Sequence, residues 1–93
     1  MTLHALLDAV QKARDAAKET LRALEQAGHP QTGESSSLYL ALVMMQKRLA
    51  NLRAGAPLGE FVGELGQLAS MCTGRLAPIK QLLDDAGRIA RGG

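Results

Sequence analysis

A seven-residue repeat of apolar side chains runs through residues 2–27, and it limits the fold of this chain more than any other feature. The two apolar positions of the repeat hold two series of residues: Leu3, Val10, Ala17 and Leu24, then Leu6, Ala13, Thr20 and Ala27. Spacings of three and four residues place such side chains on one face of an α-helix. Gly28, followed by His29 and Pro30, is typical of a helix end. The pattern predicts a helix over residues 2–27.

The composition favours helices throughout the chain. Leu and Ala contribute 16 and 15 of the 93 residues, whereas Val, Ile, Thr, Phe and Tyr together contribute 11. The first two residue types favour helix, and the other five favour strand. With one Phe, one Tyr and no Trp, the core must be aliphatic, and its alanines bury little area per residue. We expect a single all-α domain over residues 1–93, a small three- to four-helix bundle whose stability depends partly on a partner.

A second helix is predicted over residues 37–54. It follows a stretch, residues 28–36, in which two glycines, a proline and small polar residues indicate a flexible loop whose serines cap the next helix. Gly55 and Pro57 mark the end of this helix. Its core-facing stripe consists of Leu38, Leu42, Met45, Leu49 and Leu52.

Two further helices complete the predicted bundle. One spans residues 57–73 and starts with a proline, which is favoured in the first turn of a helix. Gly74 and Pro78 then break or kink the chain, and the last helix spans residues 76–90, followed by a frayed tail, residues 91–93. At about 1.5 Å per residue, the first helix is ~39 Å long and the second ~27 Å. We expect a kinked third and fourth element to match the first helix in length, and the overhang to pack against a second copy of the chain.

The first half of the second helix is apolar beyond its core-facing stripe. Leu40, Val43 and Met44 lie on a different side of the helix, and Lys47 continues that side. Such a surface is either buried all round or exposed to a partner. We assign these four residues to a candidate partner-binding surface, with the lysine at its rim.

A stripe of very small residues marks the predicted third helix. At spacings of three or four, its members are Gly59, Gly63, Gly66, Ser70 and Gly74. Three glycines inside a helix cost roughly 3 kcal/mol relative to alanines. A chain that keeps them is expected to use them for the close approach of a second helix, a role best established for small-residue stripes in membranes. Gly59, Gly63, Gly66 and Ser70 therefore join the candidate partner-binding residues.

The chain has only two histidines and one cysteine, the residue types that most often bind metals or act as nucleophiles, and they are far apart in the sequence. Neither His4 nor His29 has enough His, Cys or carboxylate neighbours at helical spacing to define a metal site. Cys72 lies on the apolar face of the third helix, where a small thiol fits the core, whereas a nucleophile needs an exposed, electropositive setting. We expect neither a metal nor a cofactor.

Two pairs of acidic residues are interpreted as solvated helix surface. General acid–base chemistry needs carboxylates in a cleft with shifted pKa values. Glu60 and Glu64 stand early in the third helix, where negative charge suits the helix dipole. The other pair is Asp84 and Asp85, of which Asp84 is spaced to interact with Arg88. We do not expect the chain to be an enzyme.

Charge gives little support to nucleic-acid binding. Eleven basic and nine acidic residues leave a net charge of +2, and the two signs are interspersed without a basic stripe. The densest basic cluster is Lys47, Arg48 and Arg53, next to a segment around Gly55 that resembles a helix–turn–helix. The following helix, however, carries two glutamates and three glycines, which offer little to the major groove. A small nucleic-acid-associated regulator that uses this cluster is the alternative function.

The chain is expected to be a cytoplasmic protein outside the membrane. Its lone cysteine cannot form an intramolecular disulfide, and its N-terminus lacks the charged leader and apolar stretch of a secretory signal. The longest nonpolar run, residues 38–45, has eight residues. About 20 are needed to span a bilayer.

The leading hypothesis is a non-enzymatic helical interaction module of the adaptor, chaperone, immunity or inhibitor type. Surplus apolar surface on a small, aromatic-poor domain motivates it. The module would self-associate, with a homodimer as the favoured form, or would bind a partner protein through the apolar helix surfaces described above.

Overall fold

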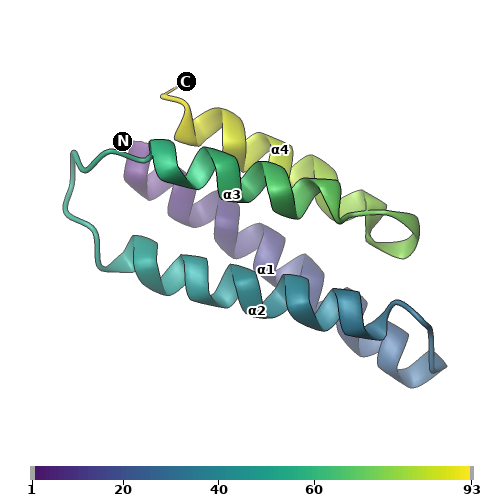
Figure 1. Ribbon diagram of the computed structural model, residues 1–93. Coiled ribbons are helices and arrows are strands. Elements are labelled where there is room, and N and C mark those ends of the chain that lie inside the picture. Colours follow the sequence, from purple (N-terminus) through teal and green to yellow (C-terminus); the bar gives the residue numbers. More distant parts are fainter. Residues whose placement is uncertain (1, 93) are drawn as a thin grey trace.

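The computed structural model describes residues 2–92 and contains four α-helices (Figure 1). These are α1 (Thr2–Ala27), α2 (Thr32–Ala50), α3 (Gly59–Ser70) and α4 (Ala77–Ala90), with a 3-10 turn (Gly74–Leu76) directly before α4. The described part of the chain contains no strand. The predicted all-α bundle with a long first helix is therefore confirmed.

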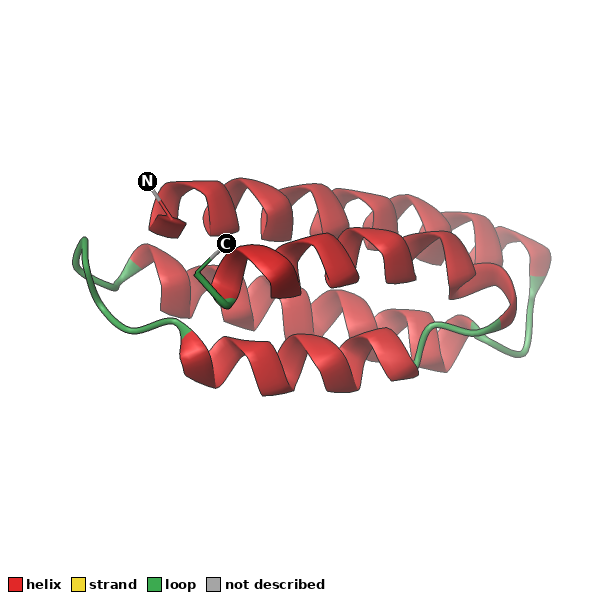
Figure 2. Ribbon diagram, turned by 90° about the horizontal axis from the view of Figure 1, so that it is seen from above, coloured by secondary structure: helices red, strands yellow, loops and turns green. Residues whose placement is uncertain are grey.

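The helices form a bundle of about 43 × 20 × 16 Å. The long helix α1 packs against both α2 and α4, and α3 packs against α4 (Figure 2). The backbones of α2 and α3 stay farther apart than those of the other neighbouring helices (Figure 1). The N-terminus, the C-terminus and the α2–α3 connection share one end of the bundle, which we call the open end (Figure 1). The α1–α2 and α3–α4 turns share the other end, which we call the closed end.

The core runs through the middle of the bundle and follows the predicted apolar stripes. All four helices contribute buried side chains: Leu6, Val10, Ala13 and Ala17 from α1; Leu38, Leu42, Met45 and Leu49 from α2; Phe61, Leu65 and Ala69 from α3; Ile79, Leu83 and Ala86 from α4. Stripe residues near the ends are less buried, since Leu3 and Leu52 are half-buried and Ala27 is exposed. The core is thin and almost entirely aliphatic, as the composition predicts.

The turn after α1 is shorter and more ordered than the predicted flexible loop over residues 28–36. Gly28 adopts a φ of +63°, and the His29 N–H donates to Leu24 O (3.0 Å), which is the hydrogen bond of a Schellman helix end. Helix α2 then begins at Thr32, whose hydroxyl donates to His29 O (2.7 Å). The serines were expected to cap the helix, but Ser35 lies inside it and is fully buried. Ordered turn contacts therefore replace most of the expected loop.

The α2–α3 connection is longer than predicted, because α2 ends at Ala50 and α3 begins at Gly59. The N–H of Leu52 bonds to Leu49 O (3.1 Å) in a tightened last turn, after which Leu52 packs against the core. Pro57 disfavours a helical conformation at the residue before it, and Leu58 is buried as the N-cap residue of α3. The connection is therefore held to the bundle by Leu58, which is buried, and by Leu52, which packs against the core.

Helices α3 and α4 form a hairpin and not one kinked element. Helix α3 ends at Ser70, and Gly74 then takes a left-handed φ of +57° as the chain reverses. Pro78 lies in the first turn of α4, where its missing N–H leaves no intrahelical hydrogen bond unmade, so it does not kink the helix. At the far end of α4, Arg91 and Gly92 still donate backbone hydrogen bonds to the last helical turn, and Gly93 lies outside the described residues. Within this hairpin, α4 packs against α1, and the packing of a second copy on α1 stays a prediction.

At the closed end, the side-chain amide of Gln31 makes two hydrogen bonds across the turns. Its Nε2 donates to the carbonyl of Thr73 (2.9 Å), and its Oε1 accepts from the N–H of Arg75 (3.0 Å). These two hydrogen bonds, which we call the Gln31 clamp, join the α1–α2 turn to the α3–α4 turn. A Cβ on Gly74 would lie 2.7 Å from Gln31 Oε1, so the clamp requires glycine there for space as well as for its backbone conformation.

Candidate functional site

The outward side of α2 exposes two large apolar side chains. Leu40 is 57% exposed and Met44 is 58% exposed, whereas most large apolar residues of the bundle are buried. Val43, on the same side, is half-buried, and Lys47 one turn further on is exposed. The structure thus brings together the four residues that the sequence assigns to a partner surface on α2. We call them the α2 face.

The α2 face belongs to an unusually uncharged helix surface. Between Glu34 and Lys47, α2 carries no charged residue, and Gly33, Ser36 and Ser37 continue the outward side toward the helix start. The outer surfaces of α1 and α4 differ, because both carry ion pairs, such as Lys12 with Asp8 (3.6 Å). An exposed helix side without charges is poorly suited to solvent and well suited to a protein contact.

The predicted basic cluster of Lys47, Arg48 and Arg53 does not form one surface, because Arg48 pairs with residues of α3. Its guanidinium holds both carboxylate oxygens of Glu64 (2.8 and 2.9 Å), approaches Glu60 (3.6 Å), and lies 4.9 Å from the centre of the Phe61 ring. The hydrogen bonds to Glu64 raise the pKa of Arg48. Arg48 therefore bridges α2 and α3 and does not join Lys47 and Arg53 in one cationic surface. This arrangement gives no support to phosphate binding.

The glycine stripe of α3 faces open space. A Cβ at Gly59, Gly63 or Gly66 would meet no atom within 4 Å, and Ser70 is exposed. No helix of the bundle uses the stripe for close approach. The stripe also lies apart from the α2 face. Gly59 lines a hollow at the open end, and Gly66 lines a groove between α3 and α4. Neither lining includes a residue of the α2 face. Contact between the stripe and a partner stays a prediction.

A hollow of about 900 Å³ lies at the open end. Its walls join the start of α1, the α2–α3 connection, the start of α3 and the end of α4. Small residues make up half of the lining: Ala54, Gly55, Ala56, Gly59, Ala90 and Gly92. We call this hollow the open-end cavity. A smaller groove of about 300 Å³ between α3 and α4 shares Val62 and Arg91 with it.

The sequence did not indicate this cavity, because its lining comes from three segments far apart in the chain. A signal was present in the run of small residues around Gly55. That run is equally typical of an ordinary loop, so composition alone could not separate the two.

Comparison with protein-family models, with curated proteins and with solved structures finds no match for this chain. Among the described helices, none combines the length and the apolar character that crossing a bilayer requires. The described residues also contain no group of three or more His, Cys, Asp or Glu side chains placed to hold a metal ion.

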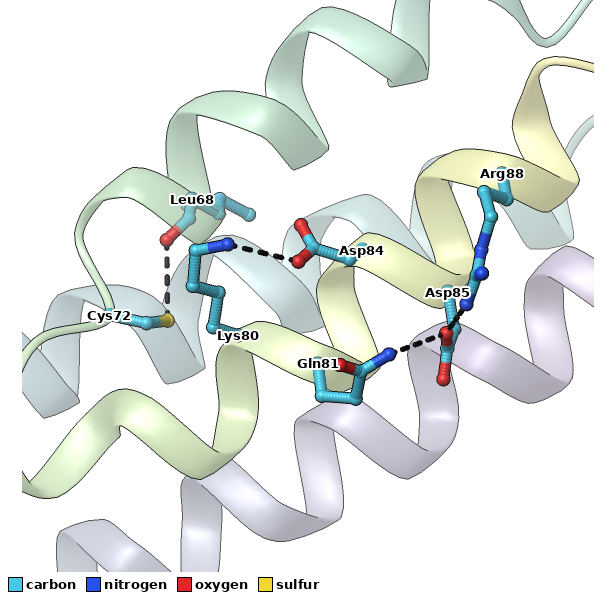
Figure 3. A network of polar contacts seen from close by, with 7 residues as sticks. All are labelled: Leu68, Cys72, Lys80, Gln81, Asp84, Asp85 and Arg88. Atoms are coloured by element: carbon cyan, nitrogen blue, oxygen red, sulfur yellow. Dashed lines mark hydrogen bonds and ion pairs between the residues drawn. The ribbon is translucent and has the colours of Figure 1, made fainter.

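The Cys72 thiol and the two acidic residues of α4, Asp84 and Asp85, make hydrogen bonds or ion pairs with residues close to them in the sequence (Figure 3). Cys72 is buried, as predicted, and its Sγ donates to Leu68 O (3.4 Å), while burial raises the pKa of the thiol. Asp84 pairs with Lys80 (3.0 Å), and Arg88 pairs with Asp85 instead of the expected Asp84. A protonated, buried thiol is a poor nucleophile. These contacts give no support to nucleophilic chemistry at Cys72.

Proposed function

We propose that this chain is a non-enzymatic interaction module of the cytoplasm, and that it forms a homodimer through the α2 face. The observation that carries the proposal is the exposure of Leu40 and Met44 on a helix side that lacks charged residues. Leu40 and Met44 are the most exposed large apolar side chains among the described residues, ahead of Met71 at 37%, and they lie one turn apart on the same helix.

A twofold contact suits this surface because each apolar side chain is then buried twice, once in each subunit. Removing Leu40 and Met44 from water in both chains would stabilise the dimer by about 1 kcal/mol per side chain, or ~4 kcal/mol in total, before the costs of association. Further contacts by Val43 and the neighbouring small residues of α2 must supply the remainder.

Charge favours an antiparallel arrangement of the two α2 helices. Helix α2 carries Glu34 in its first turn and Lys47 and Arg48 in its last turn. An antiparallel pair places the acidic end of one helix beside the basic end of the other, whereas a parallel pair places Lys47 beside its own copy. Opposed helix dipoles favour the same arrangement.

The test compares Met44→Glu and Leu40→Glu with Ala23→Glu, which adds the same charge at an exposed position of α1. Molar mass is measured by light scattering at about 100 µM, where a micromolar Kd gives mainly dimer. We expect a dimer for the wild type and for Ala23→Glu. The two α2 variants should be monomers that keep their helical circular dichroism.

A monomeric wild type at that concentration would contradict the proposal. So would a dimer that both α2 variants leave intact. Loss of helicity in Met44→Glu would show that Met44 belongs to the core, in conflict with its 58% exposure.

A further inference from the structure

Small side chains make up half of the lining of the open-end cavity, where three segments of the chain meet. The α2–α3 connection crosses this end with Ala54, Gly55 and Ala56, whose side chains are no larger than a methyl group. At the closed end, by contrast, the two hydrogen bonds of the Gln31 clamp join the turns directly. A volume of about 900 Å³ lies within the range of about 300–1,000 Å³ that is typical of small-molecule sites.

The larger side chains of the wall are apolar. Leu3 and Leu7 come from α1, Leu58 precedes α3, and Val62 lies in its first turns. Leu58 is buried, but Leu3, Leu7 and Val62 are half-buried and face the hollow without further cover. An apolar hollow of this kind favours a ligand with a hydrocarbon portion, because contact with it removes both surfaces from water.

The ionisable side chains of the cavity wall are basic. Among the described residues, His4 and Arg91 line it, and no Asp or Glu does. Arg91 forms no ion pair with another described residue, unlike Arg48 and Arg88. Helix α3 also begins at this wall with Gly59, but Glu60 already places a carboxylate in its first turn, so the cation that the wall offers is Arg91. The wall therefore complements an anion.

We propose that the open-end cavity binds a single-chain amphiphile with an anionic head group, of which a medium-chain fatty carboxylate is the simplest example. The hydrocarbon chain lies against Leu3, Leu7 and Val62. The carboxylate lies at the rim, where Arg91 donates charge-assisted hydrogen bonds. This inference does not depend on the dimer, because no residue of the α2 face lines the cavity.

The experiment is calorimetric titration of the full chain with sodium decanoate below its micellar concentration. We expect saturable binding of one decanoate per chain. Decyltrimethylammonium, which has the same chain length and the opposite charge, should bind at least about ten-fold more weakly. Vesicles of an anionic phospholipid distinguish a free amphiphile from a membrane surface, and we expect no co-flotation of the protein with them.

Variants locate the site. Ala56→Trp fills the cavity from the connection, and Val62→Glu places a carboxylate in its wall; each should weaken decanoate binding at least about ten-fold. Arg91→Gln should weaken it about five-fold, because this exposed cation is partly screened by solvent. Arg75→Gln, at the closed end, is the matched control and should leave the affinity unchanged.

Absence of saturable decanoate binding would overturn the proposal. So would equal binding of the cationic amphiphile, co-flotation with vesicles without binding of monomeric decanoate, or full affinity in both Ala56→Trp and Val62→Glu. Met44→Glu should bind decanoate normally, so the outcome for the cavity is independent of the outcome for the dimer. Loss of decanoate binding in Met44→Glu would place the ligand on the α2 face instead.

Discussion

Each end of the bundle contains a turn glycine with a positive φ, Gly74 at the closed end and Gly55 at the open end, but the two ends are built in opposite ways. At the closed end, Gly74 and Gln31 meet, and two hydrogen bonds of the Gln31 clamp join turns that lie far apart in the sequence. At the open end, the connection over residues 51–58 makes only local backbone hydrogen bonds within the described residues, such as Ala56 N–H to Arg53 O (3.0 Å). One end is fixed by a long polar side chain, and the other is hollow because its side chains are short.

This difference assigns separate tasks to the two ends. A clamp between turns holds the two helical hairpins in register, so the closed end contributes to stability. A hollow lined by small residues leaves room for a ligand or a partner at the open end. Substitutions at the closed end should therefore change the free energy of unfolding of the protein more than substitutions at the open end.

The largest effect is expected for Gly74→Ala. An alanine there has a left-handed φ of +57° and a Cβ 2.7 Å from Gln31 Oε1, so it adds backbone strain and displaces the clamp. We expect a loss of about 2–3 kcal/mol in the free energy of unfolding, measured by urea denaturation. Gly55→Ala at the open end is the control. It has a φ of +87° but no atom within 4 Å of its Cβ, so it should cost only about 1 kcal/mol.

A double-mutant cycle with Gln31→Ala separates the two causes. Once the Gln31 side chain is gone, Gly74→Ala retains only the backbone strain and should cost about 1 kcal/mol. Strictly additive effects would mean that the clamp and the glycine act independently, which the 2.7 Å approach contradicts.

A smaller effect of opposite sign is expected for Ser35→Ala, in the first turns of α2 near the closed end. Ser35 is fully buried, and its hydroxyl has no hydrogen-bond partner among the described residues. Removing an unpaired buried hydroxyl and adding the best helix former should raise the free energy of unfolding by about 1 kcal/mol. Ser37→Ala, at an exposed position of the same helix, controls for helix propensity. Equal gains in both variants would show that the Ser35 hydroxyl is satisfied by water.

The sequence predicted the helices and their core faces because both depend on local spacing. The buried stripe from Leu38 to Leu49 and the exposure of Leu40 and Met44 follow from the same 3.6-residue period. The Gln31 clamp could not be predicted in this way, since Gln31 and Thr73 are 42 residues apart and a glutamine in a turn has no periodic signal. The length of the α2–α3 connection was missed for a related reason. Gly55 and Pro57 are ordinary helix-end residues, and they carry no signal for the tertiary packing of Leu52 and Leu58 against the core.

The smallest effect concerns Gly63, in the middle of the glycine stripe and away from both ends. Its φ is not left-handed, and a Cβ there would meet no atom within 4 Å, so Gly63→Ala should raise the free energy of unfolding by about 0.8 kcal/mol through helix propensity alone. Thermal denaturation measures the gain, and light scattering measures association in the same samples.

If the stripe is only solvated surface, the melting temperature of Gly63→Ala rises and the molar mass stays unchanged. The molar mass then stays unchanged for the bulkier Gly63→Leu as well. If a second helix packs on the stripe, Gly63→Leu reduces the molar mass while Gly63→Ala does not, because leucine prevents the close approach of two backbones that glycine and, with a small shift, alanine allow. Only the second result would add the stripe to the α2 face as a contact surface.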